Sequence, residues 1–327
     1  MNLRELGEFG LIEAIRRRAG ASHPQWRVAI GDDAALLTPK PGEELVFTAD
    51  TVVENVHFRW RTTDPKSLGR KALAVNLSDV GAMGARPLGF LLTLGLPRSV
   101  SGKTLDGFLS GLLACARAAR CPLVGGDVTR AGEFSAAITA IGAVTRGRAL
   151  LRSAARPGDR VLVTGRLGAA AAGLRALERR KRLTSAELAL AKRQRAPSPP
   201  FRAGPALVRL GLSRCAIDVS DGLVRDLSHI LDESRVGARL ALESVPVAKG
   251  ATLDDALGGG EDYELLFTVG PRAPSAAVIG NRLACRVTEL GVITRQRRLI
   301  LTRAGRPVAP IARGYEHFKA SSARSDK

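Results

Sequence analysis

The stretch that decides the fold is Ala216-Ile217-Asp218-Val219-Ser220-Asp221-Gly222, a short apolar run that ends in acidic residues and glycine. Its composition favours a strand, and the longer pattern that follows has the spacing of a helix. The same order of strand and helix recurs along the chain, for example after Leu45-Val46-Phe47-Thr48. The sequence therefore predicts an α/β (α+β) fold.

A polar connector between Gly147 and Gly158 divides the chain, because a new strand-like run, Arg160-Val161-Leu162-Val163-Thr164, follows it. The 327 residues are enough for two domains, each with its own core. We expect an N-terminal α/β domain over residues 1–147, a C-terminal α/β domain over residues 148–318 and a disordered tail over residues 319–327.

Two helices are expected in the first domain. Residues 68–82 carry apolar side chains at helical spacing and place Asn76 and Asp79 on one face. The second helix is expected from Lys103 to Arg120. It follows Ser101-Gly102-Lys103-Thr104, which ends like a phosphate-binding loop, but Pro97 occupies the position of that loop's first glycine. We therefore interpret this motif as an ordinary helix start.

The chain is strongly basic, with 50 Lys and Arg against 31 Asp and Glu and a formal net charge of +19. Such a charge is typical of nucleic-acid binding when the cations cluster. Here they are spread along the chain, and the dense run 175–195 predicts a pair of solvated helices. We expect no specific nucleic-acid partner.

The amino terminus lacks the basic-then-apolar order of a secretory signal, and the longest apolar stretch, Leu88 to Leu96, is too short to cross a bilayer. We expect a cytoplasmic protein without a membrane partner. The four cysteines form no C-x-x-C pair, which predicts reduced thiols and no zinc site.

Acidic residues gather where apolar strands meet glycine. Each motif alone suits a turn or a helix cap. If the acids converge, repulsion and desolvation favour a bound cation, and an all-oxygen ligand set selects Mg²⁺ or Mn²⁺. The motifs are Gly31-Asp32-Asp33, Thr48-Ala49-Asp50, Asn76-Leu77-Ser78-Asp79, Gly125-Gly126-Asp127, Asp218-Val219-Ser220-Asp221-Gly222 and Gly259-Gly260-Glu261-Asp262.

Two further features have two interpretations each, and a third has one. The turn Thr164-Gly165-Arg166-Leu167-Gly168 suits either an anion at a helix N-terminus or close helix packing. His57 lies seven residues after Asp50 and is either a substrate contact or structural. His229, three residues after Asp226, is expected to form an ordinary pair on a helix face.

Taken in order, these motifs resemble those of the thiamine-monophosphate kinases, in the aminoimidazole-ribonucleotide-synthetase-like superfamily. The resemblance covers nearly the whole chain. Its eight motifs begin at Gly7, Ile30, Thr48, Lys71, Gly125, Ala216, Gly259 and Gly314 and end with Gly314-Tyr315-Glu316-His317-Phe318.

The resemblance implies direct in-line transfer of the γ-phosphoryl group of ATP to thiamine monophosphate, giving thiamine diphosphate, with several Mg²⁺ ions. The positions that match the metal shell are Asp33, Thr48, Asp50, Asp79, Asp127, Asp218 and Asp221. Those that match ATP contacts are Gly126, Asp127, Arg152 and Ser220, and those that match thiamine contacts are His57, Glu261 and Tyr315. Ala49 departs from relatives that carry a hydroxyl residue there, so it could offer a metal only its carbonyl.

The resemblance also implies a homodimer in which the N-terminal sheets of two subunits pair, with each C-terminal domain covering an active site. Among superfamily relatives, selenophosphate synthetases use a reactive residue near the amino terminus, whereas the first cysteine here is Cys115. Hydrogenase-maturation relatives end in a cysteine-containing tail, and this chain ends Arg324-Ser325-Asp326-Lys327. The non-enzymatic alternative is a basic RNA-binding protein whose acidic turns are structural.

Overall fold

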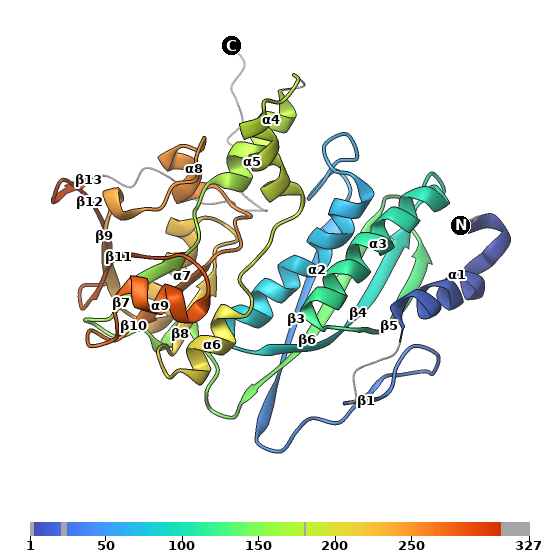
Figure 1. Ribbon diagram of the computed structural model, residues 1–327, viewed down its shortest axis with the longest axis horizontal. Coiled ribbons are helices and arrows are strands. Elements are labelled where there is room, and N and C mark those ends of the chain that lie inside the picture. The colour runs from blue at the N-terminus through green and yellow to red at the C-terminus, as the bar shows by residue number, and fades with distance from the viewer. Residues whose placement is uncertain (1–2, 21–24, 180, 309–327) are drawn as a thin grey trace, which may run out of the picture.

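Each half of the chain forms its own main β-sheet, one on each side of the connector, in the computed structural model (Figure 1), and β1 pairs with β2 in a further two-stranded sheet. The structure describes residues 3–20, 25–179 and 181–308. The tail predicted at 319–327 and the predicted site residue Tyr315 lie outside this part. The mixed α/β class predicted from the sequence is confirmed.

The first half holds a four-stranded sheet in the order β3-β6-β4-β5, with β4 and β5 parallel and the other neighbours antiparallel. Helices α2 and α3 cover one of its faces (Figure 1). The elements are α1 (Leu3–Ala19), β1 (Trp26–Val28), β2 (Leu36–Leu37), β3 (Glu43–Val53), α2 (Pro65–Ala82), β4 (Arg86–Leu96), α3 (Gly102–Ala119), β5 (Leu123–Arg130) and β6 (Ser135–Thr145).

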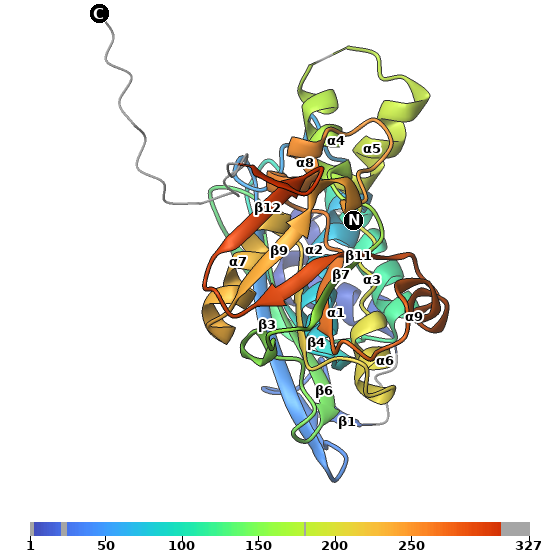
Figure 2. The ribbon, with the colours of Figure 1, turned by 90° about the vertical axis from the view of Figure 1, so that its left-hand side faces the viewer.

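The second half holds a seven-stranded sheet in the order β13-β12-β9-β11-β7-β10-β8 (Figure 2). Its strands are β7 (Arg160–Thr164), β8 (Cys215–Asp218), β9 (Gly237–Ala241), β10 (Leu265–Val269), β11 (Val287–Thr294), β12 (Leu299–Arg303) and β13 (Arg306–Val308). Its helical elements are η1 (Arg152–Ala154), α4 (Ala169–Glu178), α5 (Ser185–Arg195), α6 (Ala203–Arg209), α7 (Leu223–Ser234), η2 (Leu242–Ser244), α8 (Leu253–Gly258) and α9 (Ala276–Leu283).

Both helices expected in the first half are confirmed, and their starts have local causes. Asp64 caps α2 by accepting the Ser67 N–H at 2.9 Å, and Pro65 suits the first helical position because it needs no amide partner there. Ser101 caps α3 by accepting the Thr104 N–H at 3.1 Å. The motif that resembles a phosphate loop is therefore a helix N-terminus, as the sequence indicated.

Helix α2 packs closely against both halves of the protein because glycines line its contacts. A Cβ at Gly69 would lie 1.9 Å from the Phe108 carbonyl oxygen of α3. On the other side, a Cβ at Gly204 of α6 would lie 1.7 Å from the Gly81 carbonyl oxygen. No side chain fits between these backbones, so glycine fixes the distance between α2 and the second half.

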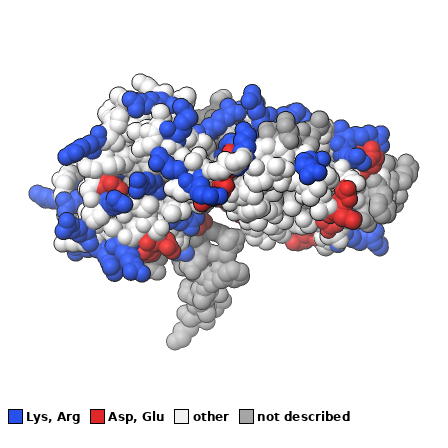
Figure 3. Space-filling model, turned by 90° about the horizontal axis from the view of Figure 1, so that it is seen from below, with Lys and Arg blue, Asp and Glu red and all other residues white. Residues whose placement is uncertain are grey.

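The surface charge is dispersed. Figure 3 shows Lys and Arg side chains scattered over both halves of one face, with acidic side chains among them. Among the described helices, none combines the length and the apolar character that a membrane crossing requires.

Replacing Gly204 by Ala tests the contact between the halves. Because the new methyl group overlaps the Gly81 carbonyl, we expect Gly204→Ala to lower the free energy of unfolding by about 1–3 kcal/mol, measured by urea denaturation. The control is Gly132→Ala, in an exposed turn with nothing within 4 Å of the added Cβ, which should change it by less than about 0.5 kcal/mol. Equal effects would show that the contact between α2 and α6 is not tight.

Candidate active site

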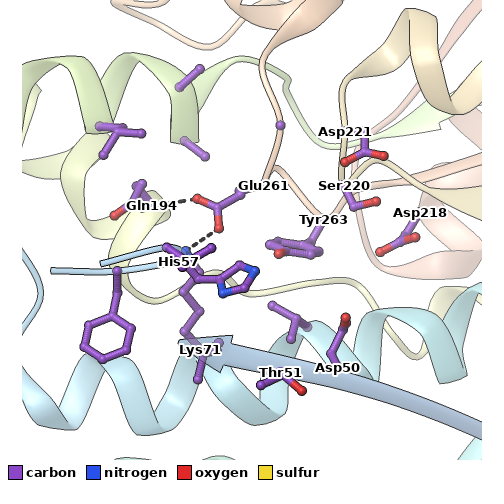
Figure 4. Close-up of a pocket in the computed structure, with 18 of the residues that line it drawn as sticks. Asp50, Thr51, His57, Lys71, Gln194, Asp218, Ser220, Asp221, Glu261 and Tyr263 are labelled. Carbon is purple, nitrogen blue, oxygen red and sulfur yellow. Dashed lines mark hydrogen bonds and ion pairs between the residues drawn. The ribbon is translucent and has the colours of Figure 1, made fainter. Parts of the chain in front are cut away.

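A cavity of about 430 Å³ lies where the two halves meet (Figure 4). Its walls come from β3 and the segment after it, from α2, α4 and α5, and from the loops that follow β8 and precede β10. The cavity has two chemically different ends. One holds carboxylates, and the other combines apolar side chains with a buried ion pair.

The carboxylate end brings together acids from both halves: Asp50 on β3, Asp79 on α2, Asp218 at the end of β8, and Asp221. Thr48 donates its hydroxyl to Asp79 Oδ2 at 2.6 Å. Ser78 of α2 donates to Asp218 Oδ2 at 2.7 Å and so joins the two halves. The convergence that the sequence predicted is present for these four acids.

Burial raises the pKa of these carboxyl groups. The pKa of Asp218 rises to about 8 through burial and the neighbouring Asp79. That of Asp79 rises to about 6, chiefly through burial, although the Thr48 hydroxyl and Arg152 oppose the rise. The pKa of Asp50 is also raised, by burial and then by Asp221. The site therefore holds more negative charge than its own cations neutralise.

Asp226 supports the loop that carries Ser220 and Asp221. Its Oδ2 accepts the N–H groups of Asp221 at 3.1 Å and Gly222 at 3.0 Å. Burial raises its pKa to about 7. The ligand atoms of Asp221, Asp226 and His229 lie within 4.8 Å of one another, so the expected pair of Asp226 and His229 also adjoins the site.

The other end of the cavity contains an ion pair between the halves. Lys71 of α2, with 3% of its side chain exposed, lies 2.5 Å through Nζ from Glu261 Oε1. Gln194 of α5 donates from Nε2 to Glu261 Oε2 at 3.2 Å (Figure 4). Both oxygens of the predicted thiamine contact Glu261 therefore already accept hydrogen bonds from the protein.

The backbone before β10 adopts a conformation that is unusual for residues other than glycine. Glu261 has φ 67° and Tyr263 has φ 52°, both in the left-handed region. Backbone hydrogen bonds hold them there, since the Glu261 N–H donates to the Ser220 carbonyl at 2.7 Å and the Tyr263 N–H to the Val219 carbonyl at 2.8 Å. These hydrogen bonds hold Glu261 in the cavity wall against the strain of its backbone.

The glycine turn before α4 binds an anion from the protein itself. Asp262 accepts the N–H of Gly168 at 2.5 Å through Oδ2 and that of Ala170 at 3.2 Å through Oδ1. An acidic side chain thus occupies the helix N-terminus, where the helix dipole stabilises negative charge. The turn also packs closely against another helix, because a Cβ at Gly168 would lie 2.8 Å from the Ala256 nitrogen of α8. Both interpretations made from the sequence, an anion at a helix N-terminus and close helix packing, therefore apply.

The run 175–195 contains the two helices that the sequence predicted, and most of it is exposed, but several of its arginines also bind groups of the protein. Arg175 pairs with Asp255 at 2.5 Å, and Arg193 of α5 pairs with the buried Glu264 at 3.0 Å. Arg195 donates to the Thr62 carbonyl of the first half. These arginines position α4 and α5 because buried carboxylates require cationic partners.

Three predicted site residues lie away from this cavity. Asp33 is in an exposed bend. Gly126 and Asp127 are on β5, at the opposite edge of the sheet from Asp50. The register Asp50–Ile138–Leu92–Gly126 crosses three strand spacings, or about 14 Å. Asp127 is one residue further along, so its side chain lies on the other face of the sheet.

The comparisons with known proteins agree with this architecture. The AIR synthase related protein, N-terminal domain, matches residues 31–144, and the corresponding C-terminal domain matches residues 156–303. A thiamine-monophosphate kinase of Escherichia coli O157:H7 is 41% identical over 324 residues, which cover 95% of this chain and 98% of the relative. The chain belongs to the thiamine-monophosphate kinase family.

Two solved structures support the assignment to this family. A thiamine-monophosphate kinase from Stenotrophomonas maltophilia K279a is 37% identical, with a TM-score of 0.81 over 91% of this chain and 96% of that one. AaThiL complexed with AMPPCP and TMP is 31% identical, with a TM-score of 0.75 over 97% of this chain and 99% of that one. The family resemblance predicted from the sequence is confirmed.

Three residues at or beside the site of this family member were assigned no site role from the sequence: Lys71, Gln194 and Asp226. Lys71 follows Arg70 and begins an otherwise apolar helical run, Ala72 to Val75, and a cation at such a position is a signal for a buried partner. Asp226 lies in the first turn of a helix, where an acid often caps amide groups. The position of Gln194 carried no comparable signal.

The raised pKa values predict that a cation bound among these carboxylates would stabilise the protein in a pH-dependent way. The pKa values of Asp79 and Asp218 are about 6 and about 8 in the folded chain, against an ordinary value of 3.8. Between pH 3.8 and these values, the two carboxylates therefore take up protons when the metal-free protein folds. Stability of the metal-free protein should therefore fall as pH rises through this range. A cation that neutralises the carboxylates reverses that loss.

Melting temperatures measured with Mg²⁺ and with EDTA test this expectation. The gain from Mg²⁺ should be larger at about pH 8 than at about pH 5, by at least about 2–4 °C, the effect of roughly 1 kcal/mol. Asp218→Asn should shrink the difference. An equal gain at both pH values would contradict a metal site formed by these acids.

Proposed function

We propose that the protein transfers the γ-phosphoryl group of ATP to thiamine monophosphate, giving thiamine diphosphate and ADP. The observation that carries this proposal is the single cavity, which joins a carboxylate end to an end that suits a heterocycle. Relatives named thiamine-monophosphate kinase and the neighbour complexed with AMPPCP and TMP support it.

We propose that Asp50, Asp79, Asp218 and Asp221 hold Mg²⁺. The fit is good because these ligands offer only carboxylate oxygens, and because burial, followed by the neighbouring carboxylates, raises the pKa values of Asp50, Asp79 and Asp218. When bound, the ions neutralise polyphosphate charge and bring the two phosphates into line.

The residues around the acids prepare this end for a nucleotide. Ser220 lies in the cavity wall, and Arg152 is close enough to Asp79 to lower its pKa against the effect of burial. Both are proposed ATP contacts. The acceptor phosphate is already anionic near neutral pH, so transfer requires positioning and charge neutralisation rather than a dedicated general base.

We assign the acceptor ring to the other end of the cavity. Val56, Phe58 and Leu174 provide apolar walls, and Glu261 provides a carboxylate. His57 also lines this space. Its Nδ1 accepts the Val53 N–H at 3.1 Å, so the proton of the neutral imidazole is on Nε2. Tyr315 stays a predicted contact from outside the described residues.

We also propose a homodimer that pairs the four-stranded sheets through the face opposite α2 and α3. On that face Phe47 is 62% exposed and Leu45 is 36% exposed, next to the cluster around Trp26. Large exposed apolar side chains on a sheet favour burial against a partner. Asp127 lies on the same face. If it binds a metal ion as predicted, it would do so at the interface with the second subunit.

The chemical proposal is tested by assaying purified protein with ATP, Mg²⁺ and thiamine monophosphate and separating the products chromatographically. Asp50→Asn should reduce kcat by at least about 100-fold, the effect of roughly 3 kcal/mol, because a metal ligand is lost. Asp127→Asn should reduce kcat to a similar extent, because Asp127 is also predicted to bind Mg²⁺. Both should melt close to wild type, and the exposed Asp232→Asn is the control. Near-normal turnover in both variants would remove the metal-shell assignment.

The dimer is tested by light scattering coupled to size-exclusion chromatography. We expect wild type to have twice the chain mass and Phe47→Glu to shift to the monomer, because a charge would be buried at the interface. Val278→Glu places the same charge at an exposed position on α9 and should stay dimeric. A monomeric wild-type protein would refute the pairing.

A further inference from the structure

Tyr263 is a cavity residue whose hydroxyl has no partner among the described residues. Its ring lies in the wall of the cavity between Glu261 and Ser220 (Figure 4). The side chain is partly exposed there, and the hydroxyl keeps open surface and makes no hydrogen bond to another described residue. A tyrosine hydroxyl both donates and accepts hydrogen bonds, so this group is available to a ligand.

The acids around Tyr263 show that its phenol lies between the two ends of the cavity. Its pKa is raised well above the usual range, first by burial and then by Glu261 at one end and by Asp50 and Asp218 at the other. Such electrostatic effects weaken with distance, so the phenol is near both groups of acids. A tyrosine with an ordinary pKa of about 10 already keeps its proton at neutral pH. The hydroxyl is therefore a neutral hydrogen-bond donor.

The backbone holds Tyr263 in this position against conformational strain. A φ of 52° is rare for a bulky aromatic residue. Asp262, the residue before it, accepts the Gly168 N–H at 2.5 Å. Glu264, the residue after it, accepts the Thr164 hydroxyl at 2.7 Å. The phenol is thus presented to the cavity by an anchored segment, and strained backbone of this kind is typical of ligand-binding sites.

We propose that the Tyr263 hydroxyl binds the phosphate group of the acceptor by donating a hydrogen bond to one of its non-bridging oxygens. This inference rests on the proposed function, which assigns Mg²⁺ and ATP to the carboxylate end and the acceptor ring to the other end. The acceptor phosphate must then lie between the two ends, where it meets the γ-phosphoryl group. Tyr263 offers a donor at that point and holds the phosphate without taking part in bond making or breaking.

The contact would make the site selective for a phosphorylated acceptor. Phosphate oxygens are charged acceptors, and hydrogen bonds to a charged group are stronger than those between neutral groups. A donor that is held in place before the ligand arrives loses little freedom on binding, so the bond contributes both to affinity and to alignment of the two phosphates. Thiamine lacks the phosphate and gains nothing from this bond. Tyr263 therefore favours thiamine monophosphate over free thiamine.

Tyr263→Phe tests this assignment because it removes only the hydroxyl. Isothermal titration calorimetry with Mg²⁺ and AMPPCP measures Kd for thiamine monophosphate and for thiamine in wild type and variant. We expect Tyr263→Phe to weaken the binding of thiamine monophosphate by at least about 10-fold, while Kd for thiamine and Kd for AMPPCP stay within about twofold. The control Thr294→Val removes a hydroxyl at the end of β11, outside the cavity walls, and should leave all three constants unchanged.

The outcomes separate this inference from the proposed function. A wild-type protein that forms no thiamine diphosphate would refute the function, whereas unchanged binding of thiamine monophosphate by Tyr263→Phe would refute only the phosphate contact. Equal weakening of thiamine and thiamine monophosphate would also overturn the contact, because the hydroxyl would then support the ring or the fold. If the thermal melt shows that Tyr263→Phe does not fold, the wild-type constants decide, and equal Kd values for the two acceptors overturn the inference.

Discussion

Repulsion among the carboxylates between the two halves is the constraint on which the rest of the structure depends. Asp50 and Asp79 come from the first half, and Asp218 and Asp221 come from the second. Burial, and then the neighbouring carboxylates, raises the pKa values of Asp50, Asp79 and Asp218, which costs folding free energy in the metal-free protein above those pKa values. The tight glycine contacts of α2 and the hydroxyl donors Thr48 and Ser78 offset part of this cost.

Helices α2 and α5 connect the halves in different ways. α2 contacts the second half through close backbone packing at Gly81 and through the Lys71–Glu261 ion pair. α5 belongs to the second half and contacts the first half through Arg195, which donates to the Thr62 carbonyl. The cavity lies between these two connections, so relative movement of the halves would change both of its ends together.

Much of the fold and part of the site could be predicted from sequence. Helix starts at Asp64 and Ser101 depend on neighbours three residues away, so local patterns were sufficient. Convergence of Asp50, Asp79, Asp218 and Asp221 followed from acids placed beside glycine at strand and helix ends. The roles of Arg193 and Gln194 could not be predicted, because their partners Glu264 and Glu261 lie about seventy residues away.

The sequence by itself determined the α/β class, the family and most of the acids that meet in the cavity, because these depend on local composition and on motif order. The tertiary structure alone decided which of those acids share one site. The order of the strands places Asp50 and Asp127 at opposite edges of one sheet, and the register of the strands places them on opposite faces. The tertiary structure also decided that Lys71 and Gln194 bind Glu261 and that Gln194 Oε1 has no partner among the described residues. Hydrogen bonding between such distant segments depends on how the chain packs.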